Sequence, residues 1–109
     1  WARQAMRLDP YAAGGRAHLL GRALYVARDY VAAIEAFEKV GVLRYGHHAE
    51  IAACHAQLES NEQARSHTRE VLRLKPDFSI ADFMQRLPFK ESKDREHHRE
   101  GLCKAGLPD

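Results

Sequence analysis

The sequence predicts an all-α fold: a right-handed solenoid of helical hairpins with capping helices at its C-terminal end. Two observations lead to this prediction. Apolar residues recur at helical spacing on both sides of short turns. In addition, the segment RLDP ending at Pro10 returns as RLKP ending at Pro76, 66 residues later, with a break near Tyr45. Because 66 residues is close to two units of about 34, we expect two repeats.

The first segment, WARQAMRLDP, has the composition of a helix but begins with no N-cap before Trp1. It stops at Asp9-Pro10, because a proline disfavours helical geometry in the residue before it. We therefore interpret residues 1–10 as the end of a truncated preceding repeat.

The first complete hairpin is expected over residues 11–44. Small or turn-prone residues from Tyr11 to Gly15 lead into a helix predicted from about Arg16 to Ala27. A second helix is predicted from Tyr30 to Val40. Asp29 is its expected N-cap, because an aspartate side chain can accept a hydrogen bond from the free N–H groups of a first helical turn.

Small residues mark where the two helices of this hairpin would touch. Gly21 and Ala33 lack the bulk that would hold the helix axes apart, and Phe37 would fill the space left at one end. Leu20 and Leu24 form an apolar stripe on the first helix, which would face the preceding repeat.

A second hairpin is expected over residues 45–77. Glycines interrupt the helical pattern up to Gly46, and helices are then predicted from His48 to Leu58 and from Asn61 to Leu74. Pro76 closes this hairpin as Pro10 closes the first segment.

The remaining residues, 78–109, are expected to form a capping helix and a trailing helix. Ser79 and Asp82 make a capping box ahead of a short helix that ends at Leu87, and this helix would cover the open end of the repeats. A last helix is predicted from about Ser92 to Ala105.

This last helix has few strong apolar anchors, namely Leu102 and Cys103. Since helices in proteins gain most of their stability from packing an apolar face, we expect it to be held loosely.

Composition and charge argue against several function classes. Lys and Arg number 17 against 15 Asp and Glu, so a net charge of +2 at pH 7 provides no concentrated basic field for nucleic acid. No apolar run approaches the roughly 20 residues that span a bilayer. Cys54 and Cys103 stand outside any metal-binding spacing, which indicates two reduced thiols. We expect a cytoplasmic segment that contacts neither nucleic acid nor membrane.

The hairpin residues resemble the tetratricopeptide repeat (TPR), a helix–turn–helix unit of 34 residues. The resemblance includes Leu20-Gly21 on the first helix, Ala33 and Phe37 on the second, and the closing proline. It implies a superhelical stack that presents a concave surface to partner proteins.

The later segments VLRLKPDFSI, RLPFK and GLCKAGLPD resemble the C-terminal TPR region of bacterial class III adenylate/guanylate cyclases. In such tails the final helix presents apolar residues where this sequence has Arg95, His98 and Arg99. The resemblance implies a regulatory or oligomerisation segment in signal transduction. It implies no catalytic residue in this segment, because the metal-binding aspartates of a cyclase domain have no counterpart here. The alternative is a general TPR adaptor with no cyclase attached.

Candidate reactive residues are few. The pairs His47-His48 and His97-His98 could suggest a metal, but neighbouring residues on a helix point about 100° apart, so surface histidines are the better interpretation. Cys54 is expected to pack half-buried, because its neighbour His55 would lie on another helix face and could not act as its base. We therefore expect no catalytic residue, no metal and no cofactor.

The concave surface is the remaining candidate site, for a protein or peptide partner. In stacked hairpins the first helix of each repeat lines this surface. The residues predicted to line it are His18, Arg22, Tyr25, Val26, Glu50 and Gln57.

A second expected surface is the end of the stack. Since about three repeats are needed for independent stability, we also expect self-association through the exposed repeat end, at Met6, Leu8, Leu20 and Leu24.

Overall fold

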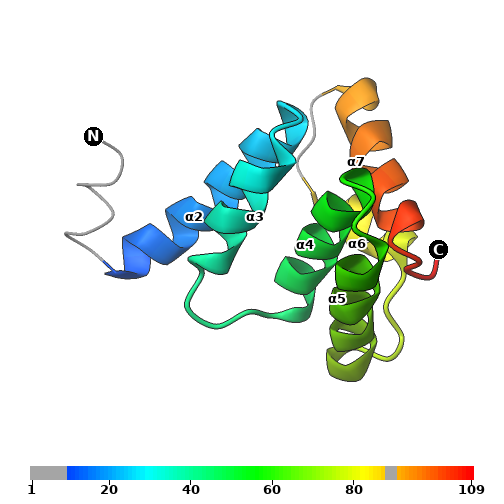
Figure 1. Ribbon diagram of the computed structural model, residues 1–109. Coiled ribbons are helices and arrows are strands. Elements are labelled where there is room, and N and C mark those ends of the chain that lie inside the picture. Colours follow the sequence, from blue (N-terminus) through cyan, green and yellow to red (C-terminus); the bar gives the residue numbers. More distant parts are fainter. Residues whose placement is uncertain (1–9, 88–90) are drawn as a thin grey trace.

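The computed structural model describes residues 10–87 and 91–109, with side chains from residue 17 onward. These residues form six helices and no strand, which confirms the all-α class for this part of the chain (Figure 1). The expected preceding repeat lies outside the described residues except for Pro10. The helices are α2 (Pro10–Val26), α3 (Tyr30–Glu38), α4 (Tyr45–Gln57), α5 (Asn61–Leu74), α6 (Ile80–Gln85) and α7 (Ser92–Lys104).

Helices α2 and α3 form one antiparallel pair. The N-cap prediction is confirmed, since Asp29 Oδ1 accepts a hydrogen bond from Ala32 N at 3.4 Å. The predicted start of α2 at Arg16 is wrong, because the helix already begins at Pro10. A proline fits the first turn of a helix, where its missing N–H would have no partner within the helix.

The close approach of α2 and α3 is also confirmed. A Cβ atom added to Gly21 would lie 2.8 Å from the ring of Phe37, so the ring occupies the space that the glycine leaves open. Phe37 is fully buried. The buried face of α2 runs through Ala17, Gly21 and Tyr25, while Leu20 remains 43% exposed.

Helices α4 and α5 form the second pair, and α4 also lies beside α3. The predicted break at Gly46 is wrong, because α4 begins one residue earlier, at Tyr45. The backbone N–H of Arg44 donates to Nδ1 of His47 at 3.0 Å, which gives this N–H a partner just ahead of the first turn of α4. Helix α5 has the predicted bounds, Asn61–Leu74.

The C-terminal segment packs back onto the two pairs. Ser79 Oγ accepts a hydrogen bond from Asp82 N at 3.4 Å, as the capping box predicts. Ile80 and Met84 of α6 are buried. The N–H of Ile80 donates to the carbonyl of Pro108 at 2.8 Å, so the last residues of the chain are joined to the start of α6.

The expectation that α7 is held loosely is wrong. This helix packs along α4 and also touches α2 and α6. Leu102 is fully buried as expected, but Cys103 is exposed. The rest of the buried face consists of His97, His98 and Gly101, which carry little apolar surface. Packing of polar and small residues holds α7 where the sequence pattern indicated few anchors.

Candidate protein-binding site

The six residues predicted to line the concave surface lie on α2 and α4, and α7 covers part of that surface. Tyr25 and Glu50 are fully buried, whereas His18, Arg22 and Gln57 are partly exposed. Side-chain contacts join His18, Arg22 and Glu50 in one group and Tyr25 with Gln57 in another, and His98 of α7 lies against both groups. Val26, near the end of α2, is partly buried and has no polar side chain to join the network.

Tyr25 connects three helices through its hydroxyl group. It donates to the backbone carbonyl of His97 at 2.9 Å and accepts a hydrogen bond from Gln57 Nε2 at 3.1 Å. The amide oxygen of Gln57 accepts a hydrogen bond from Lys104 Nζ at 3.1 Å. Burial raises the pKa of Tyr25 well above its ordinary value, so the hydroxyl keeps its proton. This chain of hydrogen bonds links α2 and α4 to α7.

Glu50 is a buried carboxyl group on α4 that faces both α2 and α7. Its Oε1 is 3.4 Å from Nε of Arg22 and 3.6 Å from Nε2 of His98, and its Oε2 is 3.8 Å from Nδ1 of His18. These partners come from α2 and α7. Burial raises the pKa of Glu50 to about 7, although Arg22 opposes that shift.

The two imidazoles beside Glu50 are neutral near pH 7. Burial and the charge of Arg22 lower the pKa of His98 to about 3, and burial followed by Arg22 lowers that of His18 to about 4. Arg22 is therefore the cation that faces the carboxyl group.

Gly101 sets how closely α7 can approach α2 and α4. A Cβ atom added there would overlap the hydroxyl of Tyr25 and lie 3.1 Å from Cβ of Ala53. Gly101 was not among the predicted site residues, although a glycine inside a predicted helix is a usable signal.

Two of the predicted residues line a pocket that is open to solvent. A pocket of about 240 Å³ lies beside His18 and Arg22, between the start of α4 and α6. Its lining residues are His18, Arg22, Arg44, Tyr45, Gly46, His47 and Phe83. Tyr25 and Glu50 are therefore covered, whereas His18 and Arg22 line this pocket. Gln57 lines another pocket, of about 750 Å³, together with residues of α7.

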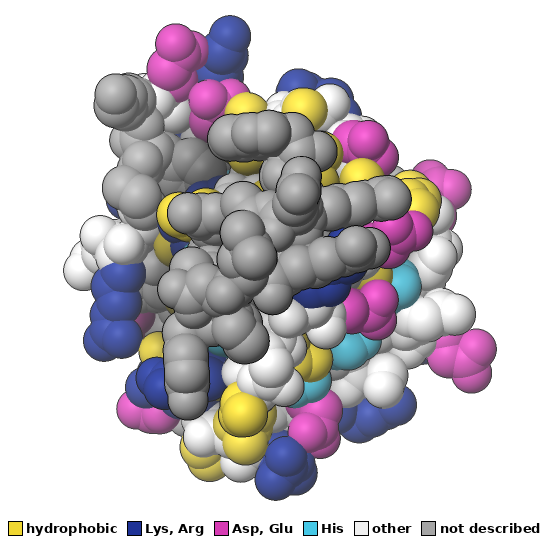
Figure 2. All heavy atoms as spheres, turned by 90° about the vertical axis from the view of Figure 1, so that its left-hand side faces the viewer, with side chains coloured by type: hydrophobic (Ala, Val, Ile, Leu, Met, Phe, Trp, Pro, Cys, Tyr) yellow, Lys and Arg dark blue, Asp and Glu magenta, His cyan; other side chains and the backbone are white. Residues whose placement is uncertain are grey.

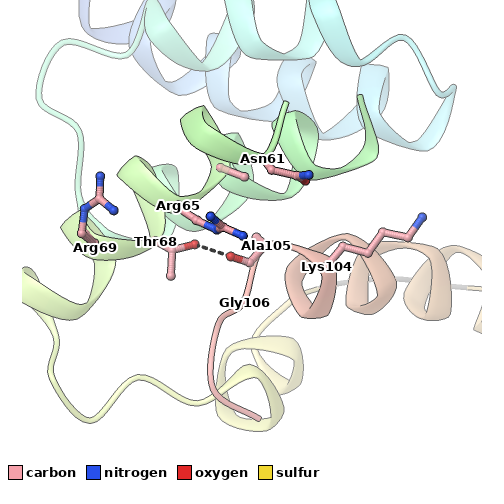
Figure 3. Close-up of a pocket in the computed structure, with 8 residues that line it drawn as sticks. Asn61, Arg65, Thr68, Arg69, Lys104, Ala105 and Gly106 are labelled. Atoms are coloured by element: carbon pink, nitrogen blue, oxygen red, sulfur yellow. Dashed lines mark hydrogen bonds between the residues drawn. The ribbon is translucent and has the colours of Figure 1, made fainter. Parts of the chain in front are cut away.

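A separate pocket, of about 480 Å³, lies between α5 and the end of α7 (Figure 3). Thr68 Oγ1 on α5 donates to the carbonyl of Ala105 at 2.9 Å, which anchors the C-terminal end of α7. Arg65 and Arg69 line this pocket from α5, and Lys104 lines it from α7.

The histidine pairs have different surroundings. The interpretation of His97-His98 as solvated is wrong, because their exposed fractions are 8% and 0%. His97 Nε2 is 2.7 Å from the hydroxyl of Tyr30. In the other pair, Nδ1 of His48 lies 3.0 Å from Nδ1 of His67. No group of three or more His, Cys, Asp or Glu in residues 10–87 and 91–109 could hold a metal ion.

Cys54 is fully buried, which is deeper than the half-buried position expected. Burial raises the pKa of its thiol well above the ordinary value, with a smaller contribution from Glu50. The thiolate form is therefore disfavoured at this position.

The expected self-association face lies partly outside the described residues, since it includes Met6 and Leu8. On α2, Leu20 is 43% exposed and Leu24 is partly buried. Figure 2 shows this side of the molecule, where the visible hydrophobic side chains lie interspersed with charged ones.

None of the helices in the described part of the chain has the length and apolar character needed to cross a membrane. No family model, no curated protein and no solved structure matches this chain.

Proposed function

We propose that this chain is a non-catalytic protein-interaction or assembly module made of TPR-like hairpins in a right-handed solenoid. One observation supports this most directly. The first helices of the two hairpins, α2 and α4, together present a surface that already holds a helix, α7. Side-chain hydrogen bonds and close packing on this surface are the kind of contact by which helical hairpins hold a partner helix.

The narrower hypothesis is that this module is the C-terminal regulatory or oligomerisation segment of a bacterial adenylate/guanylate cyclase, working in the cytoplasm. Its support is the sequence resemblance of the segments VLRLKPDFSI, RLPFK and GLCKAGLPD. In that setting the hairpins would hold subunits together or present a partner to the cyclase domain.

The experiment compares cyclic nucleotide production and oligomeric state of the full-length parent protein with and without residues 1–109. We expect a changed rate or a changed assembly state on deletion. A parent protein without cyclase activity would remove the narrower hypothesis and leave the general adaptor as the function.

A further inference from the structure

We propose that the pocket between α5 and the end of α7 is a binding site for a phosphate group. Its volume of about 480 Å³ is within the range of small-molecule sites in proteins. Arg65 and Arg69 of α5 would hold the phosphate, and Lys104 of α7 would add a third positive charge (Figure 3). This inference goes beyond the proposed function and does not depend on it.

The first argument is the charge of the pocket. Its described lining residues include Arg65, Arg69 and Lys104 but no Asp or Glu. The two arginines are four residues apart on α5, so they lie on one face of the helix and repel each other. Nζ of Lys104 is 3.0 Å from Oε1 of Glu100, and in Figure 3 this side chain points away from the arginines. Arg65 and Arg69 are therefore the main candidates to hold an anion.

The second argument is that neither arginine has an acidic partner. In the described part of the chain, no ion pair includes Arg65 or Arg69. Glu70, which follows Arg69 in the sequence, instead accepts two hydrogen bonds from Arg73, at 3.0 and 2.8 Å. Each guanidinium group presents a planar fork of N–H donors that matches the oxygens of a phosphate. Both forks remain available to a ligand.

The third argument concerns the opposite wall of the pocket, which is the C-terminal end of α7. Carbonyl oxygens at a helix C-terminus attract cations and would compete with an anion for the arginines. Here the carbonyl of Ala105 accepts from Thr68 Oγ1 at 2.9 Å, and that of Cys103 accepts from the N–H of Gly106 at 3.0 Å. A Cβ atom added to Gly106 would meet nothing within 4 Å. This wall therefore has two of its acceptors occupied and leaves open space for a ligand.

The start of α5 adds to the positive field of the pocket. Asn61, the first residue of the helix, lines the pocket, and the N-cap residue Ser60 makes no side-chain hydrogen bond to the first turn. The positive end of the helix dipole lies there and favours a nearby negative charge. The dipole and the two arginines therefore act in the same direction.

Two guanidinium groups favour a phosphate over a carboxylate. A phosphate monoester carries about −1.5 to −2 charges near pH 7 and has three strong acceptor oxygens. A carboxylate carries a single charge and two oxygens. A phosphate can therefore accept hydrogen bonds from both arginines at once, and the volume of the pocket leaves room for a small molecule that carries it.

The test is isothermal titration calorimetry of the full chain with ribose 5-phosphate, in a phosphate-free buffer at neutral pH and constant ionic strength. Inorganic phosphate and acetate are titrated in the same way. The test variant combines Arg65→Gln with Arg69→Gln. The control combines Lys39→Gln with Arg86→Gln, which removes the same charge from exposed positions outside the pocket.

We expect ribose 5-phosphate to bind the wild-type chain with a dissociation constant on the order of 1 mM. The arginine variant should bind it at least about tenfold more weakly, because it loses charge-assisted hydrogen bonds. The control should bind as the wild type does, and acetate should bind more weakly than phosphate. Tighter binding of ribose 5-phosphate than of inorganic phosphate would assign the site to a phosphate ester, and equal binding would assign it to the free ion.

Three outcomes would overturn the inference. The wild-type chain could show no saturable binding of either phosphate compound. The arginine variant could bind as tightly as the wild type, which would place the phosphate elsewhere. The control could lose as much affinity as the arginine variant, which would show an effect of overall charge.

The arginine variant is expected to fold, because both arginines are exposed and their mutual repulsion is removed. Circular dichroism checks this. The proposed function is tested separately, by deletion of residues 1–109 from the parent protein, so the failure of one leaves the other intact.

Discussion

The interface between α2 and α3 and the interface beneath α7 are built from different kinds of side chain. In the first, the ring of Phe37 fills the space over Gly21, and no polar group is needed. In the second, Tyr25 and Glu50 are buried with their polar atoms facing α7. An apolar interface tolerates changes of side chain that keep its volume. A buried polar interface is stable only when each donor and acceptor has a partner. The comparison shows that one small chain holds one helix pair by apolar packing and a further helix largely by polar contacts.

The largest expected effect on stability comes from the apolar interface between α2 and α3. Phe37→Ala would remove a fully buried ring beside Gly21 and leave a cavity, so we expect the free energy of unfolding to fall by about 3–5 kcal/mol. Urea denaturation followed by circular dichroism measures this change. Val31→Ala on the same helix is the control, because Val31 is 56% exposed and should matter by about 0.5 kcal/mol or less. Equal effects of the two substitutions would contradict the packing described here.

The second prediction concerns the polar interface beneath α7, where the contribution of Glu50 to stability depends on pH. The folded pKa of Glu50 is raised to about 7 from an ordinary 4.5, so folding favours the protonated carboxyl group. Its contribution to stability is therefore fully present below pH 4.5 and is lost as the pH rises through 7. Glu50→Gln cannot lose a proton, and we expect it to gain roughly 3 kcal/mol relative to wild type between pH 4.5 and 8.

The nearby histidines act in the opposite direction. His98 and His18 have pKa values lowered to about 3 and about 4, so their neutral forms favour folding and stability falls as the pH drops below 6.5. Both variants in the comparison share these histidines, so the difference between wild type and Glu50→Gln isolates the carboxyl group. Glu35→Gln, an exposed change on α3, is the control. A difference that stays constant across this pH range would show that Glu50 is not buried under α7.

The two interfaces also differ in how far the sequence could predict them. The bounds of α5 and the cap at Asp29 depend on residues close in sequence, so periodicity and capping rules were sufficient. The Gly21–Phe37 contact joins neighbouring helices and follows from residue size.

The docking of α7 instead depends on Tyr25 meeting His97, 72 residues away. The local pattern around His97 and His98 is polar and therefore indicates a solvent-exposed face. Only a three-dimensional arrangement that supplies Tyr25, Tyr30 and Glu50 turns those histidines into a buried contact.

A smaller effect on stability is expected from the cap of α3, which depends only on residues close in sequence. Asp29→Ala would remove the acceptor for Ala32 N at the start of α3, and we expect a loss of about 1 kcal/mol in the free energy of unfolding. Glu35→Ala, later on the same helix and exposed, keeps the cap and should change stability little. Thermal denaturation of the two variants side by side measures the difference. A loss as large for Glu35→Ala as for Asp29→Ala would assign the effect to charge rather than to capping.

The weakest expected effect concerns self-association through the exposed face of α2. We predict self-association through the exposed end of the repeats, where Leu20 on α2 is 43% exposed. Leu20→Asp places a charge on this face and should lower the weight-average mass in sedimentation at high protein concentration, because a buried unpaired charge disfavours contact. Val42→Asp is the control, since Val42 is 80% exposed and lies between α3 and α4. A wild-type chain that remains monomeric at high concentration would contradict this prediction.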